Sequence, residues 1–346
     1  MINWKPVAII VILLTIIGGY LLIPNQRANT EKNVELTICN AGSLTIPLQK
    51  ISEAYQNKTG IRILLEPSGS VDAVRKVTDL HKNCDIVAVA DYRLIPMYMY
   101  PNYTKWYIAF ASNKLVIVAS HKTSINKNLT SILREIMEND VKYGFSDPNR
   151  DPCGYRSIGV IGLISLKLHN TSILEDLVIN KIPGSKYDYV NGTLNIYIPA
   201  SFTPKGNLVV RPKSIQLISL LESGEIEYAF EYQSVAIQHN LSYITLPEDV
   251  NLGNPSYEEN YSHVTVHILT GTTMEKPITM APIVYGLTVP TTAKHYKEAV
   301  DFVKYILQDG KTVFNNLGQP FLEKPIGEGN IPEELVELVE GSSVTS

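Results

Sequence analysis

Four short segments of this sequence carry residue types that bind anions at the starts of helices. They are rich in serine, glycine and proline and span 40–43, 67–70, 151–156 and 211–214. Backbone N–H groups at a helix N-terminus lack partners within the helix and carry the positive end of its dipole. Glycine lets a ligand approach the backbone closely, and serine adds a hydroxyl donor. Four such termini around one cleft would bind an anion without a cationic side chain.

Ordinary helix capping is the alternative interpretation of the same segments. Serine, aspartate and glycine are common N-cap residues, and proline is common at the first helical position. For any single segment, capping alone explains the pattern. Two of the four segments directly follow predicted strands, where ligands of α/β proteins bind, so both interpretations stay open.

Catalytic motifs are missing from the sequence. There is no G-x-S-x-G, no G-x-x-x-x-G-K-[ST] and no H-E-x-x-H, and the seven histidines are scattered. We therefore expect no enzyme activity, no catalytic residue and no cofactor. A surface hydrolase or an adhesion protein is the alternative from another class, but no nucleophile–base pair supports it.

Composition excludes several classes of protein. The chain has 346 residues, of which 45% are hydrophobic and 18% charged, with a net charge of −4. Such a chain is neither disordered nor a general binder of nucleic acid, because it has ample apolar content and no basic excess. Its length predicts two domains.

The N-terminus reads as a targeting or anchoring segment. An apolar run over 7–23 follows Lys5 and precedes a polar stretch. The run is near the lower limit for a membrane span, and no clear cleavage site follows it. We expect 1–33 to be a membrane anchor or a signal segment, with a buried core helix as the alternative. The rest of the chain would then lie on the extracytoplasmic face of the membrane, anchored or secreted.

The three cysteines form no metal-binding pattern and cannot all pair. Cys39 falls late in one predicted strand and Cys84 at the start of another. If these strands are parallel neighbours, the two residues are too far apart for a bridge. We therefore expect no disulfide framework.

The rest of the pattern alternates short β segments with amphipathic helices. Apolar strands over 34–39, 62–66 and 85–90, separated by helices, predict a mainly parallel sheet of the α/β class. A long β stretch over 107–119 is expected to cross between domains. We predict one lobe from 34–115 plus 282–346, a second lobe from 116–281, and a cleft between them.

At the four segments 40–43, 67–70, 151–156 and 211–214, called the anion-type segments below, the sequence resembles the archaeal molybdate/tungstate ABC-transporter substrate-binding proteins. The residues that carry the resemblance lie at 41–44, 66–71, 90–96, 106–108, 147–149, 151–157, 211–213, 224–236 and 282–286. The resemblance covers about 34 to 335. It implies a two-lobed periplasmic-binding-protein fold of the second topological class. It also implies that molybdate or tungstate is held between the lobes and delivered to an ABC permease and its ATPase.

Carried over by position, the resemblance implies a set of ligand-binding residues. They are Gly42, Ser43, Ser70, Asp151, Pro152, Cys153, Ser214 and Tyr232. The family pattern has an acid at the position of Ser214, and this acid and the one matching Asp151 bond the metal centre of the anion. Here Asp151 is the one possible ligand to molybdenum or tungsten that remains, so we expect fewer than six ligands.

A carboxylate beside a dianion repels it, and a low local dielectric strengthens the repulsion. Asp151 is tolerable if it ligates a central metal or accepts a proton from hydrogen phosphate. It therefore argues against sulfate and for molybdate or tungstate, with phosphate or another tetrahedral oxyanion as the alternative. Its own alternative role is to cap the helix that starts at Pro152.

Overall fold

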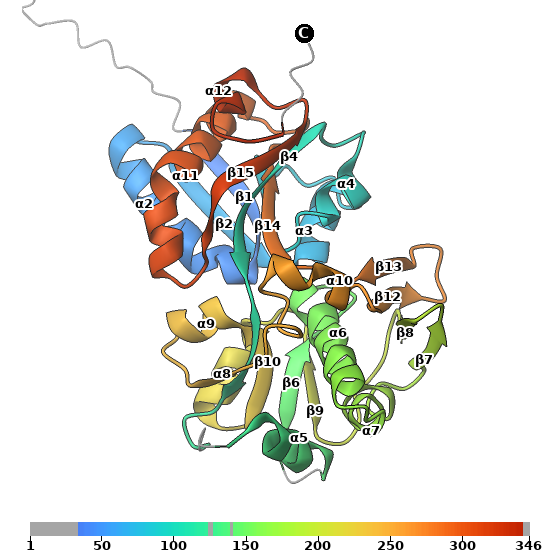
Figure 1. Ribbon diagram of the computed structural model, residues 1–346. Helices are drawn as coiled ribbons and strands as arrows, with labels where there is room; N and C mark the ends of the chain where they lie inside the picture. The colour runs from blue at the N-terminus through green and yellow to red at the C-terminus, as the bar shows by residue number, and fades with distance from the viewer. Residues whose placement is uncertain (1–33, 124–126, 139–140, 342–346) are drawn as a thin grey trace, which may run out of the picture. The chain divides into compact units, whose positions relative to one another are not determined.

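The computed structural model describes residues 34–123, 127–138 and 141–341, so the predicted N-terminal segment 1–33 lies outside it. Within these ranges, no helix combines the length and the apolar character that a membrane crossing requires. The predicted α/β class is confirmed, because three β-sheets are flanked by helices (Figure 1).

The first sheet has the strand order β15-β4-β14-β3-β1-β2. Its strands are β1 (Glu35–Ala41), β2 (Arg62–Ser68), β3 (Ile86–Val89), β4 (Trp106–Asn113), β14 (Ile283–Thr288) and β15 (Phe321–Gly329). Its helices are η1 (Gly42–Leu44), α2 (Thr45–Thr59), α3 (Ser70–Thr78), α4 (Leu94–Met99), α11 (Tyr296–Asn316) and α12 (Glu333–Val336). Strands β1, β2 and β3 pair in parallel, as their apolar runs predict. Strands β14, β4 and β15 join antiparallel.

The second sheet has the strand order β11-β5-β10-β6-β9. Its strands are β5 (Leu115–Ala119), β6 (Tyr143–Ser146), β9 (Leu208–Arg211), β10 (Tyr228–Tyr232) and β11 (Tyr243–Thr245). The accompanying helices are α5 (Leu129–Met137), α6 (Pro152–Lys167), α8 (Gln216–Ser223) and α9 (Gln233–Gln238). Only the pairings of β6 with β10 and β9 are parallel among the described strands of this sheet. The prediction of a mainly parallel sheet is therefore wrong in this detail, because β5, which enters from the first sheet, is antiparallel to both of its neighbours, β10 and β11.

A third, four-stranded sheet lies in the order β13-β12-β8-β7 and was not predicted as a sheet. Its strands are β7 (Lys186–Val190), β8 (Thr193–Pro199), β12 (Val264–Thr270) and β13 (Lys276–Thr279). Short helices accompany it: α7 (Ser172–Leu174), η2 (Glu175–Ile179), η3 (Pro255–Tyr257) and α10 (Glu258–Tyr261). Asn191 and Gly192 join β7 to β8 with φ values of +52° and +82°. Both values fit the primed hairpin turn that this dipeptide favours.

The long predicted β stretch is divided between two sheets. Strand β4 ends at Asn113 in the first sheet, and β5 starts at Leu115 in the second. The buried Asn113 amide fixes this crossing, since its Nδ2 donates to Ser234 Oγ (2.7 Å) and to Tyr285 Oη (2.8 Å). Strands of the first sheet thus come from 35–113 and 283–329, and those of the other sheets from 115–279. The lobe boundaries themselves stay a prediction.

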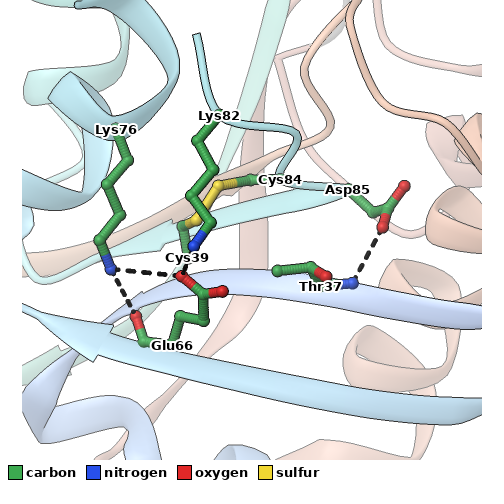
Figure 2. The surroundings of a disulfide bond; sticks show 7 residues. All are labelled: Thr37, Cys39, Glu66, Lys76, Lys82, Cys84 and Asp85. Carbon is green, nitrogen blue, oxygen red and sulfur yellow. Dashed lines mark hydrogen bonds and ion pairs between the residues drawn. A yellow bond between two sulfur atoms is a disulfide. The ribbon is translucent and has the colours of Figure 1, made fainter. Parts of the chain in front are cut away.

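The expectation of no disulfide is wrong, because Cys39 and Cys84 are bonded with a Cα–Cα distance of 5.8 Å. The prediction treated Cys84 as a strand residue, whereas β3 starts only at Ile86. In the parallel ladder Cys39 is level with Val87, and an extended chain would place Cys84 too far away. The loop ahead of β3 instead turns back toward β1, as Figure 2 shows. Cys153 is buried and free.

Removing both bonded cysteines, by Cys39→Ala with Cys84→Ala, should lower the free energy of unfolding. The bond closes a loop with a sequence separation of 45. Loop-closure entropy of that length corresponds to about 4 kcal/mol. Urea denaturation under oxidising conditions measures the difference, and the variant should match the wild type once the wild type is reduced. Equal stability under oxidising conditions would contradict the prediction.

Candidate anion-binding site

The four anion-type segments meet in the structure. Gly42 follows β1, and a Cβ added to it would lie 3.1 Å from the side chain of Ile215, next to Ser214. A Cβ added to Gly69 would lie 2.2 Å from the carbonyl oxygen of Arg150. Segments 40–43 and 67–70, which follow strands of the first sheet, therefore pack against residues in or directly beside 211–214 and 151–156. This close approach explains why glycine stands at both positions.

Three of the predicted residues are buried hydroxyls whose oxygens already accept a hydrogen bond. Ser70 Oγ accepts from the backbone N–H of Ala90 (2.9 Å), and Ser43 Oγ accepts from Tyr285 Oη (3.3 Å). Tyr232 Oη accepts from Arg156 Nη1 (2.8 Å). Each hydroxyl keeps a hydrogen for which the described residues provide no acceptor. Such unpaired donors are costly in a buried place, so an acceptor from outside would satisfy them.

Arg156 connects two of these hydroxyls, those of Ser70 and Tyr232, and no role was assigned to it from the sequence. Its Nη1 also donates to the carbonyl oxygen of Ala90 (2.7 Å), whose N–H binds Ser70. Its Nη2 lies 3.3 Å from Asp91 Oδ2. The side chain is 1% exposed, and its Nε has no partner in the part of the chain that the structure describes. The sequence led us to expect an anion site without a cationic side chain. The structure instead places the buried guanidinium of Arg156 in contact with the phenol of Tyr232.

A signal for Arg156 exists in the sequence. It is the one charged residue of α6 before Lys167 at the C-terminal end, in a helix that is otherwise apolar or small. A charge in the buried part of such a helix requires a partner, and here the partner is Asp91. Burial would raise the pKa of Asp91, but Arg93 and Arg156 hold it well below its usual range.

Asp151 caps α6, as its alternative interpretation proposed. One carboxylate oxygen accepts from the N–H of Cys153 (3.3 Å) and the other from the N–H of Ser214 (2.7 Å). Burial raises the pKa of Asp151 to about 6, although these hydrogen bonds oppose the shift. Whether Asp151 also ligates a metal centre stays a prediction. Among the described residues, no cluster of three or more histidine, cysteine, aspartate or glutamate residues could hold a metal ion.

Pro152 and Cys153 form the first turn of α6, and both are buried. The thiol of Cys153 donates to Glu231 Oε1 (3.4 Å) and faces the carbonyl oxygen of Phe230 (3.7 Å). Burial raises the pKa of the Cys153 thiol well above its usual value, and the nearby Glu231 contributes in the same direction. The thiol is therefore neutral, and we expect it to take part only by packing and hydrogen bonding.

Glu231 is a second carboxyl group of the site that the sequence analysis did not single out. It is 0% exposed on β10, directly before Tyr232. Burial raises its pKa to about 8, and the nearby charge of Asp151 adds to the shift. An acid within the apolar strand 228–232 was the available signal, because a strand buried on both faces rarely carries an unpaired charge.

The rim of the site joins the two sides through protein contacts alone. Two N–H groups in the first turn of α3, those of Val71 and Asp72, donate to the carbonyl oxygen of Arg150 at 3.1 and 3.4 Å. The Arg150 guanidinium pairs with the Asp72 carboxylate at 2.6 Å. Lys213 Nζ donates to the carbonyl oxygen of Pro67 (3.3 Å). A groove of about 780 Å³, lined in part by Pro67, Asp72, Arg150 and Lys213, borders the rim. The N-terminus of α3 thus serves the rim, while Ser70 remains for the site.

The sequence profile of the bacterial extracellular solute-binding proteins matches residues 36–318. The chain belongs to this family. An uncharacterised solute-binding protein of Staphylothermus marinus is 49% identical over 97% of this chain and 96% of that protein. The molybdate/tungstate-binding protein WtpA of Thermococcus kodakarensis is 43% identical, over 95% of this chain and 94% of that protein.

Solved structures show the same fold. The periplasmic molybdate-binding protein of Azotobacter vinelandii matches with a TM-score of 0.57 at 14% identity. The match covers 82% of this solute-binding protein and 98% of that chain. The chain therefore has the two-lobed fold of periplasmic binding proteins. As a member of a solute-binding family it is a transport component and not an enzyme.

Replacing Gly69 with alanine tests the close approach at the rim. The new Cβ would meet the backbone of Arg150, which cannot move aside as a flexible side chain can. We expect the N–H groups of Val71 and Asp72 to lose their acceptor and to exchange with deuterium at least about tenfold faster. The matched control is Gly310→Ala, whose Cβ would meet side chains alone, the nearest being the end of Ile51 at 3.1 Å. Unchanged exchange in Gly69→Ala would show that the rim does not depend on this glycine.

Proposed function

We propose that this protein captures molybdate or tungstate between its two lobes and delivers the anion to an ABC permease with its ATPase. The observation that carries the proposal is the set of buried hydroxyls of Ser43, Ser70 and Tyr232, each with an occupied oxygen and an unused hydrogen. Such a set gives donors and no acceptors, as a fully deprotonated oxyanion requires. The relatives named for molybdate and tungstate support this choice of anion.

The charges around the hydroxyls also favour a dianion with a central metal. Arg156 supplies a buried positive charge beside Tyr232, but Asp91 offsets it. Asp151 would repel a sulfate ion, whereas it can bond a molybdenum or tungsten centre. Ser214, where the family pattern has an acid, would add one more hydroxyl donor. We therefore propose that Asp151 is the family-type acid that remains, and that the metal has fewer than six ligands.

The proposed lobes are 34–115 with 282–346, and 116–281, so that the site lies where the two strand crossings meet. Closure of the lobes on the anion would shift the population toward the form that the permease recognises. The family is extracellular, and the Cys39–Cys84 disulfide fits an oxidising compartment. We further propose that 1–33 anchors the protein to the membrane or directs its secretion.

Calorimetric titration of the full-length protein with tungstate, molybdate, sulfate and phosphate tests the proposed ligand. We expect dissociation constants of about 1 nM for tungstate and molybdate and no measurable heat for the other two anions. Tight binding of phosphate or sulfate would instead mean that the serine at position 214 changed the ligand. Release of product from phosphate esters or peptides would overturn the transport function.

Ser70→Ala should weaken tungstate binding, because the hydroxyl hydrogen of Ser70 would bond the anion. A hydrogen bond to a charged group contributes about 1.5–3 kcal/mol, or roughly a 10- to 150-fold change in affinity. The matched control is Ser52→Ala in α2, where the buried Oγ has no partner among the described residues. We expect the control to bind as the wild type does. If Ser70→Ala binds tungstate as tightly as Ser52→Ala does, the hydroxyl of Ser70 does not contact the anion.

A further inference from the structure

A buried carboxyl oxygen beside the proposed site has no partner. Glu231 Oε2 is inaccessible to solvent, and no hydrogen-bond partner for it occurs in the described part of the chain. We propose that Glu231 is a ligand-binding residue that, as the neutral acid, donates a hydrogen bond from Oε2 to the bound oxyanion. This inference rests on the proposed function and adds a residue and a bound proton to it.

The hydrogen bonds of the other oxygen decide where the proton lies. Glu231 Oε1 accepts from the backbone N–H of Tyr232 (2.7 Å) and from the thiol of Cys153 (3.4 Å). An oxygen that accepts two bonds acts as the carbonyl oxygen of a neutral carboxylic acid. The proton then belongs to Oε2, which becomes a buried donor without an acceptor. The hydroxyls of Ser70 and Tyr232 are likewise buried donors whose hydrogen has no acceptor among the described residues.

The surroundings favour the neutral acid. Asp151, at the start of α6, adds negative charge, and the thiol of Cys153 stays neutral. The hydroxyl of Ser214, in the segment before α8, and the backbone N–H of Tyr232 on β10 favour the ionised form by hydrogen bonding, but burial outweighs both. On the neighbouring strand β5, Glu231 faces Val116, which does not titrate.

Arg156, on α6, is the positive charge of this region, but its hydrogen bonds and ion pair in the described part of the chain are with Ala90, Asp91 and Tyr232 rather than with Glu231. With its pKa raised to about 8, Glu231 is mostly protonated at neutral pH. A bound dianion would favour the proton further, so binding near pH 8 would take up part of a proton. The donor is lost as pH rises through the pKa, because an ionised Glu231 repels the anion.

Two substitutions separate hydrogen bonding from shape. Glu231→Gln places an amide that can accept at the position of Oε1 and donate at the position of Oε2 at every pH. Glu231→Met keeps a similar length and removes the donor. Glu225→Gln is the matched control, since Glu225 is an exposed acid just ahead of the same strand. Tungstate affinity of each full-length protein would be measured by calorimetry between about pH 6 and pH 9 in two buffers of different ionisation enthalpy.

We expect the wild type and Glu225→Gln to bind tungstate roughly tenfold more weakly at about pH 9 than at about pH 7, with proton uptake near pH 8. Glu231→Gln should bind within about threefold of the wild type at pH 7, without the loss at high pH and without proton uptake there. Glu231→Met should bind about tenfold or more weakly at pH 7. Thermal unfolding of each variant confirms that it is folded, and Glu231→Gln gives the answer even if Glu231→Met does not fold.

The inference is overturned if Glu231→Gln keeps the pH dependence of the wild type, or if folded Glu231→Met binds as tightly as the wild type. It is also overturned if the wild type releases protons on binding, because Glu231 would then act as an ionised ligand. Each of these results leaves tungstate binding intact and contradicts only the role of Glu231. Absence of binding by the wild type at every pH would overturn the proposed function and this inference together.

Discussion

The buried guanidinium of Arg156 is the constraint on which the site depends. Removing an arginine and an aspartate from water costs several kcal/mol per ion, and good geometry has to offset this. Arg156 belongs to α6 in the second sheet's part of the fold, and Asp91 follows β3 in the first. Asp91 also pairs with Arg93 of its own part at 2.7 Å, whereas Arg156 has no other ion-pair partner among the described residues and is buried only where Asp91 faces it. Separating the two parts would therefore leave the Arg156 charge without its partner, so the ion pair favours the arrangement in which they are in contact.

The same guanidinium sets the positions of two proposed donors. It holds the phenol of Tyr232 on one side and the peptide between β3 and Asp91 on the other, where Ala90 in turn orients Ser70. Tyr155, its neighbour on α6, donates to Asp91 (2.9 Å) and limits how the carboxylate can turn. Binding geometry thus follows from a structural network in which the anion itself takes no part.

Much of the fold could be predicted from the sequence, because the spacing of apolar residues indicates which faces of strands and helices are buried. The strands at 35–41, 62–68 and 86–89 and the helices between them follow the pattern. The antiparallel pairings of β14, β4 and β15 and the assembly of four strands into the third sheet were not predicted, since pairing between distant segments leaves no local trace. The disulfide was missed because the path of the loop before β3 cannot be read from the position of Cys84.

The site was predicted in part for the same reason. Turn residues such as Gly42 and Ser70 have local signatures, and the structure brings their segments together. Glu231 and Arg156 have no such signature, because their importance comes from which atoms lack partners after folding. An acid or a base inside an apolar segment was the available clue, and it indicates burial without telling which ligand or partner balances it.

The rim contacts also affect how well a permease can distinguish loaded from empty protein. Every contact among Gly69, Asp72, Arg150, Lys213 and Pro67 joins one protein atom to another, so each favours closure whether or not cargo is present. Stronger rim contacts would raise the affinity for the anion, because less of its binding energy would be needed to close the lobes. They would also let empty protein adopt the form that a permease recognises, and idle carriers would then compete with loaded ones. Rim contacts that are too weak would therefore lower the affinity for the anion. Rim contacts that are too strong would let empty protein bind the permease.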